Sequence, residues 1–317
     1  MGFENLMQKA EQIRAKAHER AWLDVPPDRD PEGTPSIERP REVARIQARA
    51  VGIPGTFQPF TKMPNPAGFD GAIGQLEQAM RRLGTGQDTS DPIARGGPVS
   101  TANPVLEAID DVKDDVEEWS GKAAQEFRTN YLRPLPAVIH NQFLLVSALK
   151  SVLEAEQAMW KAARDDVMSI ADNTYNRMDN LHGYGSNEAV VIFTVTASIA
   201  GLVASAGGGG LAIVLALIGG SASAIADIVG LEAPTPTQIT GTKVTEVIAS
   251  MEGAVELLTL KIIETEHKLA RAVIAINRQI NQAQLSSDPN KQVFCTRRPA
   301  LANASRGTIR RDMGYSD

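Results

Sequence analysis

Hydrophobic residues recur at steps of three and four along much of the chain, which is the spacing of one face of an α-helix. Residues 2–24 show this pattern over a few turns, and residues 137–181 show it over many. The longest example, residues 242–285, carries an almost unbroken heptad stripe that is typical of a coiled coil. The pattern predicts an all-α protein, an elongated helical bundle with essentially no β-sheet.

Prolines, glycines and apolar runs divide the chain further. Residues 26–66 hold nine of the 18 prolines, so we expect this arm to be extended or irregular, apart from a helical stretch near residues 41–51. The predicted regions are 1–68 for the N-terminal helix and proline-rich arm, 69–183 for a helical hairpin region, 184–232 for a hydrophobic glycine-rich hairpin, 233–285 for the long amphipathic helix, and 286–317 for a loose polar tail.

The hydrophobic hairpin is nearly all apolar or small, and four consecutive glycines split it. Its small residues recur at steps of four on both arms, a spacing that lets two helices pack closely in lipid or in a protein core. Its β-branched start, AVVIFTVTAS, favours a strand locally but lies in a helical context. The residues concerned are Ala197, Gly201 and Ser205, then Gly207, Gly208, Gly209 and Gly210, then Ala212, Ala216 and Gly220.

Two environments suit this hairpin. It could be buried in the bundle against the stripe of residues 242–285, or it could associate with a membrane. Acidic rather than basic residues flank it, which does not favour a membrane over the core. Our hypothesis is a packed hairpin that opens to associate with membrane.

The string EEWSGKAAQEF, residues 117–127, interrupts one of the helical patterns. Trp119 lies on the apolar stripe of the preceding segment, so we expect its ring to be buried between two helical arms. Gly121 allows a tight or left-handed backbone. The small pair Ala123 and Ala124 permits close approach of the arms, and Phe127 resumes the apolar stripe. The string therefore predicts a helix-turn-helix hairpin.

This W-x-G string resembles the hairpin motif of the WxG, or Esx-like, family of type VII secretion substrates. A second family element, Tyr-x-x-x-Asp/Glu after the second arm, serves there as the export signal. YNRMD places Tyr175 and Asp179 four residues apart on one helical face, and YGSNE places Tyr184 and Glu188 in the same pattern just downstream.

The resemblance implies a non-enzymatic substrate or effector of an actinobacterial secretion system. Such a protein would be secreted or held at the cell surface without a cleavable signal peptide. Its partners would be the secretion machinery and a helical partner or a second copy. The alternative function is that of a membrane-active, pore-forming-like helical protein that uses residues 189–231.

The chain also departs from the family. More than a hundred residues precede the turn, and Pro134 and Pro136 interrupt the second arm. The resemblance covers only residues 69–188, and residues 242–285 could supply a partner helix within the same chain. The chain therefore looks like a large, multi-helix substrate.

Composition narrows the remaining chemistry. The net charge of −6 argues against a nucleic-acid binder, and the only cysteine, Cys295, excludes an internal disulfide. The acidic run at residues 107–118 reads as one solvated helix face rather than a calcium loop. No catalytic motif stands out, and four histidines share no ligand spacing: His18, His140, His182 and His267. We therefore expect no enzyme activity, no cofactor and no metal.

Overall fold

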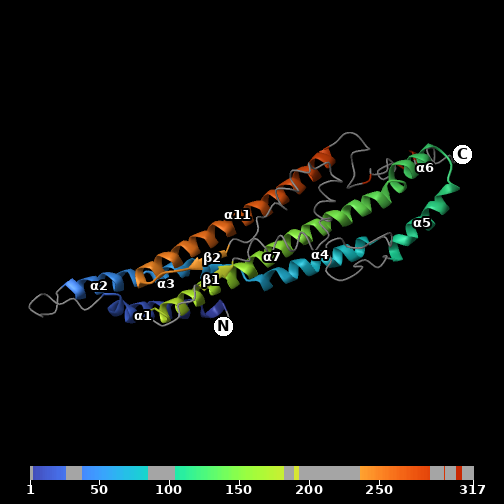
Figure 1. Cartoon of the computed structure of the whole chain (residues 1–317). Helices are drawn as coiled ribbons and strands as arrows, with labels where there is room; N and C mark the ends of the chain where they lie inside the picture. The colour runs from blue at the N-terminus through green and yellow to red at the C-terminus, as the bar shows by residue number, and fades with distance from the viewer. Residues whose placement is uncertain are drawn as a thin grey trace, which may run out of the picture. The chain divides into compact units, whose positions relative to one another are not determined.

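The computed structural model describes residues 3–25, 38–84, 104–181, 189–192, 236–285, 296 and 305–308 (Figure 1). These residues are almost entirely helical, which confirms the all-α prediction. The α-helices are α1 (Leu6–Asp24), α2 (Glu38–Ala50), α3 (Ile53–Phe57), α4 (Asp70–Leu83), α5 (Pro104–Glu117), α6 (Lys122–Phe127), α7 (Leu135–Asp179) and α11 (Val244–Leu285). Short 3₁₀ turns cover Phe3–Asn5, Gln58–Lys62 and Pro66–Phe69, and a π-helical turn covers Arg128–Leu132.

The two longest helices are those with the longest hydrophobic patterns. α7 has 45 residues and α11 has 42, so each is about 65 Å long at 1.5 Å per residue. Both bury one stripe of side chains along their length. On α11 the buried stripe includes Val244, Ile248, Met251, Val255, Leu258, Ile262, Leu269 and Ile276.

The chain divides into two compact units, and both long helices contribute to each. The first unit comprises Met1–Gly68, Ala155–Gly201 and Leu231–His267. The second comprises Phe69–Glu154, Leu202–Gly230 and Lys268–Asp317. Of the tail after residue 285, only residues 296 and 305–308 are described.

The core of the first unit forms around α1. This helix packs against α2 and α3, and it buries the small side chains of Ala10, Ala17 and Ala21, which lets neighbouring helices approach closely. Ile53 and Phe57 of α3 are also fully buried.

The proline-rich arm is more ordered than the sequence predicted. Its helical stretch is α2, as expected, but residues 53–69 form α3 and two 3₁₀ turns instead of an irregular segment. Pro54 and Pro59 occupy the first turns of two of these short helices, where the missing N–H of proline costs no hydrogen bond. Residues 26–37 lie outside the described residues.

The second unit has a core to which α4, α7 and α11 all contribute. Met80 of α4 packs with Phe143, Leu144 and Ala148 of α7, and with Ile276 of α11. All five side chains are buried, so this cluster ties together three segments that are distant in sequence.

Residues 189–192 adopt the strand that their β-branched side chains favour locally, and not the helix of the surrounding pattern. Strand β1 (Ala189–Ile192) pairs antiparallel with β2 (Pro236–Ile239), with Ile192 opposite Pro236. Three consecutive β-branched residues, VVI, explain the local choice, because such side chains favour a pleated strand. The ribbon brings residues 192 and 236 together. The residues between them, which include the predicted glycine-rich hairpin from Ala197 to Gly220, lie outside the described residues.

Side chains of α7 and α1 form hydrogen bonds with the turn between β2 and α11. Arg177 of α7 is buried, and its Nε and Nη2 donate to the Gly241 carbonyl oxygen at 3.0 and 2.6 Å. Gly241 has φ +139°, and an added Cβ would lie 2.7 Å from the Val247 nitrogen, so the turn requires glycine. The Asp24 carboxylate of α1 accepts a hydrogen bond from the Val244 N–H and thereby caps α11.

Candidate functional site

The W-x-G string forms a sharp turn between α5 and α6 (Figure 1). Gly121 has φ +95° and ψ 165°, a backbone conformation that is essentially restricted to glycine. Ala123 and Ala124 directly after it are buried, as expected for close approach of the two arms. These residues therefore form a turn between two helices.

Arg128, which follows α6, forms hydrogen bonds with the end of α5 and so links the two helical arms. Its Nη1 donates to the carbonyl oxygens of Val116 and Glu117, at 3.4 and 3.0 Å. These carbonyls belong to the last turn of α5, which has no intrahelical partner for them. A basic side chain also interacts favourably with the negative end of the helix dipole.

Trp119 is not the buried wedge that its stripe position predicted. Its side chain is 44% exposed. Its ring instead stacks on Phe127, with centroids 6.2 Å apart, and Phe127 stacks on Tyr131 at 5.2 Å. The stripe position misled because α5 ends at Glu117, two residues before the tryptophan, so helical periodicity no longer sets where its ring points.

Pro134 and Pro136 interrupt the helical structure of the second arm for only two residues, between Leu132 and Leu135. After α6, residues Arg128–Leu132 form a π-helical turn, and α7 begins at Leu135. Pro134 and Pro136 lie at the start of α7, where proline is tolerated, and the Val138 N–H donates to the Pro134 carbonyl oxygen at 3.0 Å. The two prolines therefore lie where α7 begins, just after the π-helical turn ends.

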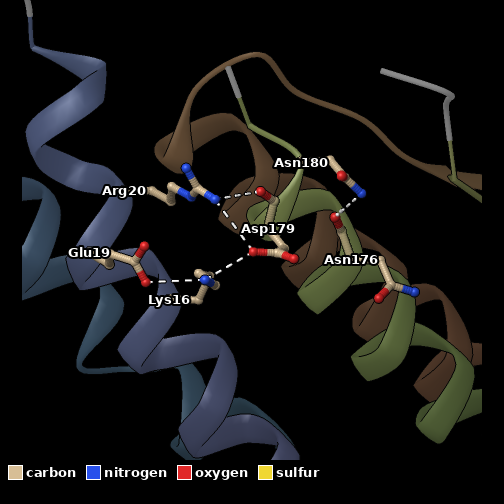
Figure 2. Close-up of polar contacts among 6 residues, drawn as sticks. All are labelled: Lys16, Glu19, Arg20, Asn176, Asp179 and Asn180. Atoms are coloured by element: carbon tan, nitrogen blue, oxygen red, sulfur yellow. Dashed lines mark hydrogen bonds and ion pairs between the residues drawn. The ribbon is translucent and has the colours of Figure 1, made fainter. Parts of the chain in front are cut away.

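The predicted export motif lies on the last turns of α7, against α1. Figure 2 shows Lys16 and Arg20 of α1 reaching the Asp179 carboxylate, with Lys16 Nζ at 2.9 Å and Arg20 Nη2 at 3.4 Å. Arg20 Nη2 also donates to the Asp179 carbonyl oxygen at 2.7 Å. Nearby, Lys9 Nζ lies 4.3 Å from the centre of the Tyr175 ring, a cation–π contact.

Lys16 and Arg20 stabilise the Asp179 carboxylate, which lies at the C-terminal end of α7. A carboxylate in the last turn of a helix faces the negative end of the helix dipole, which disfavours it. Lys16 compensates for this charge and also pairs with Glu19 at 3.1 Å (Figure 2). Lys9 makes a second ion pair across the two helices, with Asp172 at 2.8 Å. The Tyr175–Asp179 face is therefore joined to a basic face of α1.

The contact shifts the protonation of both partners. The hydrogen bond from Lys16 holds the pKa of the Asp179 carboxyl below its usual range, and Arg20 acts in the same direction. The hydrogen bond to Asp179 correspondingly raises the pKa of the Lys16 ammonium group. Both groups thus remain charged across the neutral range.

Sequence reasoning missed the part that α1 plays. Lys9, Lys16 and Arg20 follow one another at steps of seven and four, so they share a helical face, and this spacing was a detectable signal. The spacing could have shown a basic stripe but not its acidic partner, because the pairing joins residues more than 150 positions apart.

Several predicted residues lie outside the described part of the chain. These are Tyr184 and Glu188 of the second tyrosine motif and all ten small residues of the glycine-rich hairpin. The described carboxylates of the acidic run, on α5 and directly after it, are exposed: Asp111, Asp114, Asp115, Glu117 and Glu118. Within the described residues, no three His, Cys, Asp or Glu side chains are grouped so that they could hold a metal ion.

Comparisons with known proteins add no relative. No family model matches the chain, and no curated protein or solved structure matches it significantly. Among the described helices, none combines the length and the apolar character needed to cross a membrane.

We predict that Gly121→Ala destabilises the protein more than Trp119→Ala. The glycine substitution forces a strained backbone and should cost about 1–3 kcal/mol, whereas the half-exposed indole should lose about 1 kcal/mol of stacking. Urea unfolding measures both. Gly74→Ala is the matched control, because Gly74 lies within α4 with open space around its Cβ and should gain about 0.5–1 kcal/mol. Equal effects of Gly121→Ala and Gly74→Ala would contradict the strained turn.

We predict a pH window for the contact between α1 and α7. Because folding lowers the pKa of Asp179, its stabilisation is present above the usual aspartate pKa of about 3.9 and is lost as pH falls through the folded-state value. Because folding raises the pKa of Lys16, its share is present below about pH 10.4 and is lost as pH rises through its folded-state value. NMR titration of the Asp179 carboxyl carbon in wild type and in Lys16→Met should show a higher pKa in the variant. An unchanged pKa would show that Lys16 does not act on Asp179 in solution.

Proposed function

We propose that this protein is a non-enzymatic substrate or effector of a type VII, Esx-like secretion system. The observation that carries the proposal is the turn at Gly121. The W-x-G string occupies a tight inter-helical turn whose backbone requires glycine, and it leaves the aromatic ring of Trp119 on the surface. An exposed aromatic side chain on a rigid turn is well suited to recognition by another protein.

The end of α7 supports the same proposal. Tyr175 and Asp179 lie on one helical face in the last turns, and both side chains are partly accessible. Helix stability alone does not favour a carboxylate there, because it opposes the dipole and requires cations from α1. A role in recognition gives a reason for its presence.

The geometry also defines what a receptor would meet. Tyr175 and Asp179 are not an isolated helical motif, because Lys9, Lys16 and Arg20 lie against them. A secretion component that binds this motif would contact α1 as well, or would displace the two basic side chains from the carboxylate. Export in the folded state follows from the first arrangement.

We predict that Tyr175→Ala together with Tyr184→Ala abolishes export while the fold remains intact. Secretion would be measured by the amount of full-length protein in the medium of an actinobacterial host, and folding by circular dichroism and thermal midpoint. Tyr175→Phe keeps the ring that Lys9 contacts and removes only the hydroxyl, so it separates recognition of the phenol from packing. Normal secretion of the double variant would refute the signal.

A second pair of variants separates recognition from stability at Asp179. Asp179→Asn removes the motif carboxylate and its ion pair, whereas Lys16→Gln removes the same ion pair from the side of α1 and keeps the carboxylate. If Asp179 is read by the secretion machinery, only Asp179→Asn blocks export. Equal loss of export in both variants would mean that the contact between the helices, and not the motif, is required.

The β1–β2 ribbon favours a second candidate, a membrane-active protein. It fixes residues 192 and 236 side by side, so the apolar sequence between them starts and finishes at one place. No charged residue occurs from residue 189 to residue 226. A segment whose ends are held together, and which carries no charge before Asp227, suits insertion as a hairpin from one side of a bilayer.

We predict that the protein binds dye-loaded liposomes and makes them leak, and that Gly201→Lys reduces leakage by placing a charge among apolar residues. Fluorescence of released dye measures this at neutral and acidic pH. Val51→Lys is the control, since Val51 is exposed and lies outside the apolar stretch. Absence of both binding and leakage for wild type would exclude the membrane function.

A further inference from the structure

Helix α11 carries a second apolar face that points away from the core. Its buried stripe, with Leu258 and Leu269, lies on the opposite side. Leu260 is 56% exposed, Ile263 is 43% exposed and Ile274 is 57% exposed. Three large aliphatic side chains along one exposed helix face are more than the scattered apolar residues of an ordinary surface.

The exposed face follows a regular spacing. Its residues succeed one another at alternating steps of three and four, the spacing of a coiled-coil seam. The central positions are apolar or small around His267, and the outer positions are polar apart from Gly253. In order, the seam contains Gly253, Glu256, Leu260, Ile263, His267, Ala270, Ile274, Asn277 and Asn281, and all are exposed.

Charge along α11 is strongly polarised. From Val244 to residue 266 the helix carries five glutamates and one lysine, whereas from His267 to Leu285 it carries Lys268, Arg271 and Arg278 and no acidic residue. The helix dipole favours such a distribution only within the first and last turns. The charges at Glu256, Glu266 and Arg271 lie outside these turns, so the helix dipole does not account for them.

We propose that α11 pairs antiparallel with α11 of a second copy of this chain, crossing near His267. An antiparallel arrangement places the acidic half of each seam against the basic half of the other, with Glu256 near Arg278 of the second copy. A parallel arrangement would oppose like charges along the whole seam. The exposed aliphatic residues from Leu260 to Ile274 then overlap with those of the second copy and leave water.

This pairing goes beyond the proposed function and does not depend on it. The face belongs to one continuous helix, so helix geometry alone defines which residues share it. A single-helix seam is small for an interface, so we expect a dissociation constant in the micromolar range.

Sedimentation equilibrium of the full chain tests the dimer. Cys295→Ser would be introduced throughout to remove the only thiol. Wild type should show a monomer–dimer equilibrium, and Leu260→Lys with Ile274→Lys should raise the dissociation constant at least tenfold. Val51→Lys and Val112→Lys change exposed valines elsewhere and should leave it unchanged. Circular dichroism confirms that each variant remains helical.

Disulfide trapping tests the orientation. Gly253 and Asn281 lie equally far from His267 on either side, both are exposed, and a Cβ at Gly253 meets nothing within 4 Å. When chains carrying Gly253→Cys and Asn281→Cys are mixed and oxidised, antiparallel pairing predicts the mixed disulfide. A parallel pair would hold these positions about 42 Å apart and give only disulfides between identical variants.

Three results would overturn the proposal. One is a wild type that remains monomeric up to about 100 μM, well above a micromolar dissociation constant. Another is a dimer that Leu260→Lys with Ile274→Lys does not weaken, or one that forms only the identical disulfides. The third is a monomeric wild type that dimerises once residues 193–235 are replaced by a short turn joining β1 to β2, which would show that this segment occupies the face.

Discussion

One short helix satisfies polar groups at the ends of both long helices. The last carbonyls of a helix and its first N–H groups have no partner within the helix, and burying them without one is costly. In α1, Arg20 donates to the last carbonyl oxygen of α7, and Asp24, four residues later on the same face, accepts from the first N–H of α11. Arg177 closes the arrangement by binding the Gly241 carbonyl between β2 and α11. The first unit depends on these contacts, because they fix where its two long helices end and begin.

The same constraint explains the charges at the candidate export motif. Asp179 would be unfavourable at the end of α7 without cations, and α1 supplies two of them. If the motif is recognised as proposed, its receptor must accommodate Lys16 and Arg20 or compete with them for the Asp179 carboxylate.

The features that point to function are all on the surface. Trp119 is exposed on a turn that only glycine permits, the tyrosine motif lies against a basic helix face, and α11 presents an apolar seam. Within the described residues, neither a metal-binding group nor a membrane-spanning helix was found. We propose helical contacts with other proteins as the activity that these surfaces favour, with self-association through α11 among them.

The sequence alone was sufficient for the class of fold and for the helices with long periodic patterns, α1, α7 and α11, because helical periodicity accumulates over many turns. It also located the Gly121 turn, since few residues other than glycine adopt that backbone. It was wrong about the exposure of Trp119 and about the ordered helices of the proline-rich arm, and it left the strand at residues 189–192 undecided, because these outcomes depend on neighbours or on a single turn. A strand needs a partner, and β2 lies more than 40 residues away. Only the tertiary structure could pair Asp179 with α1 and Asp24 with α11, because a periodic pattern records which residues share a face but not which distant face they meet.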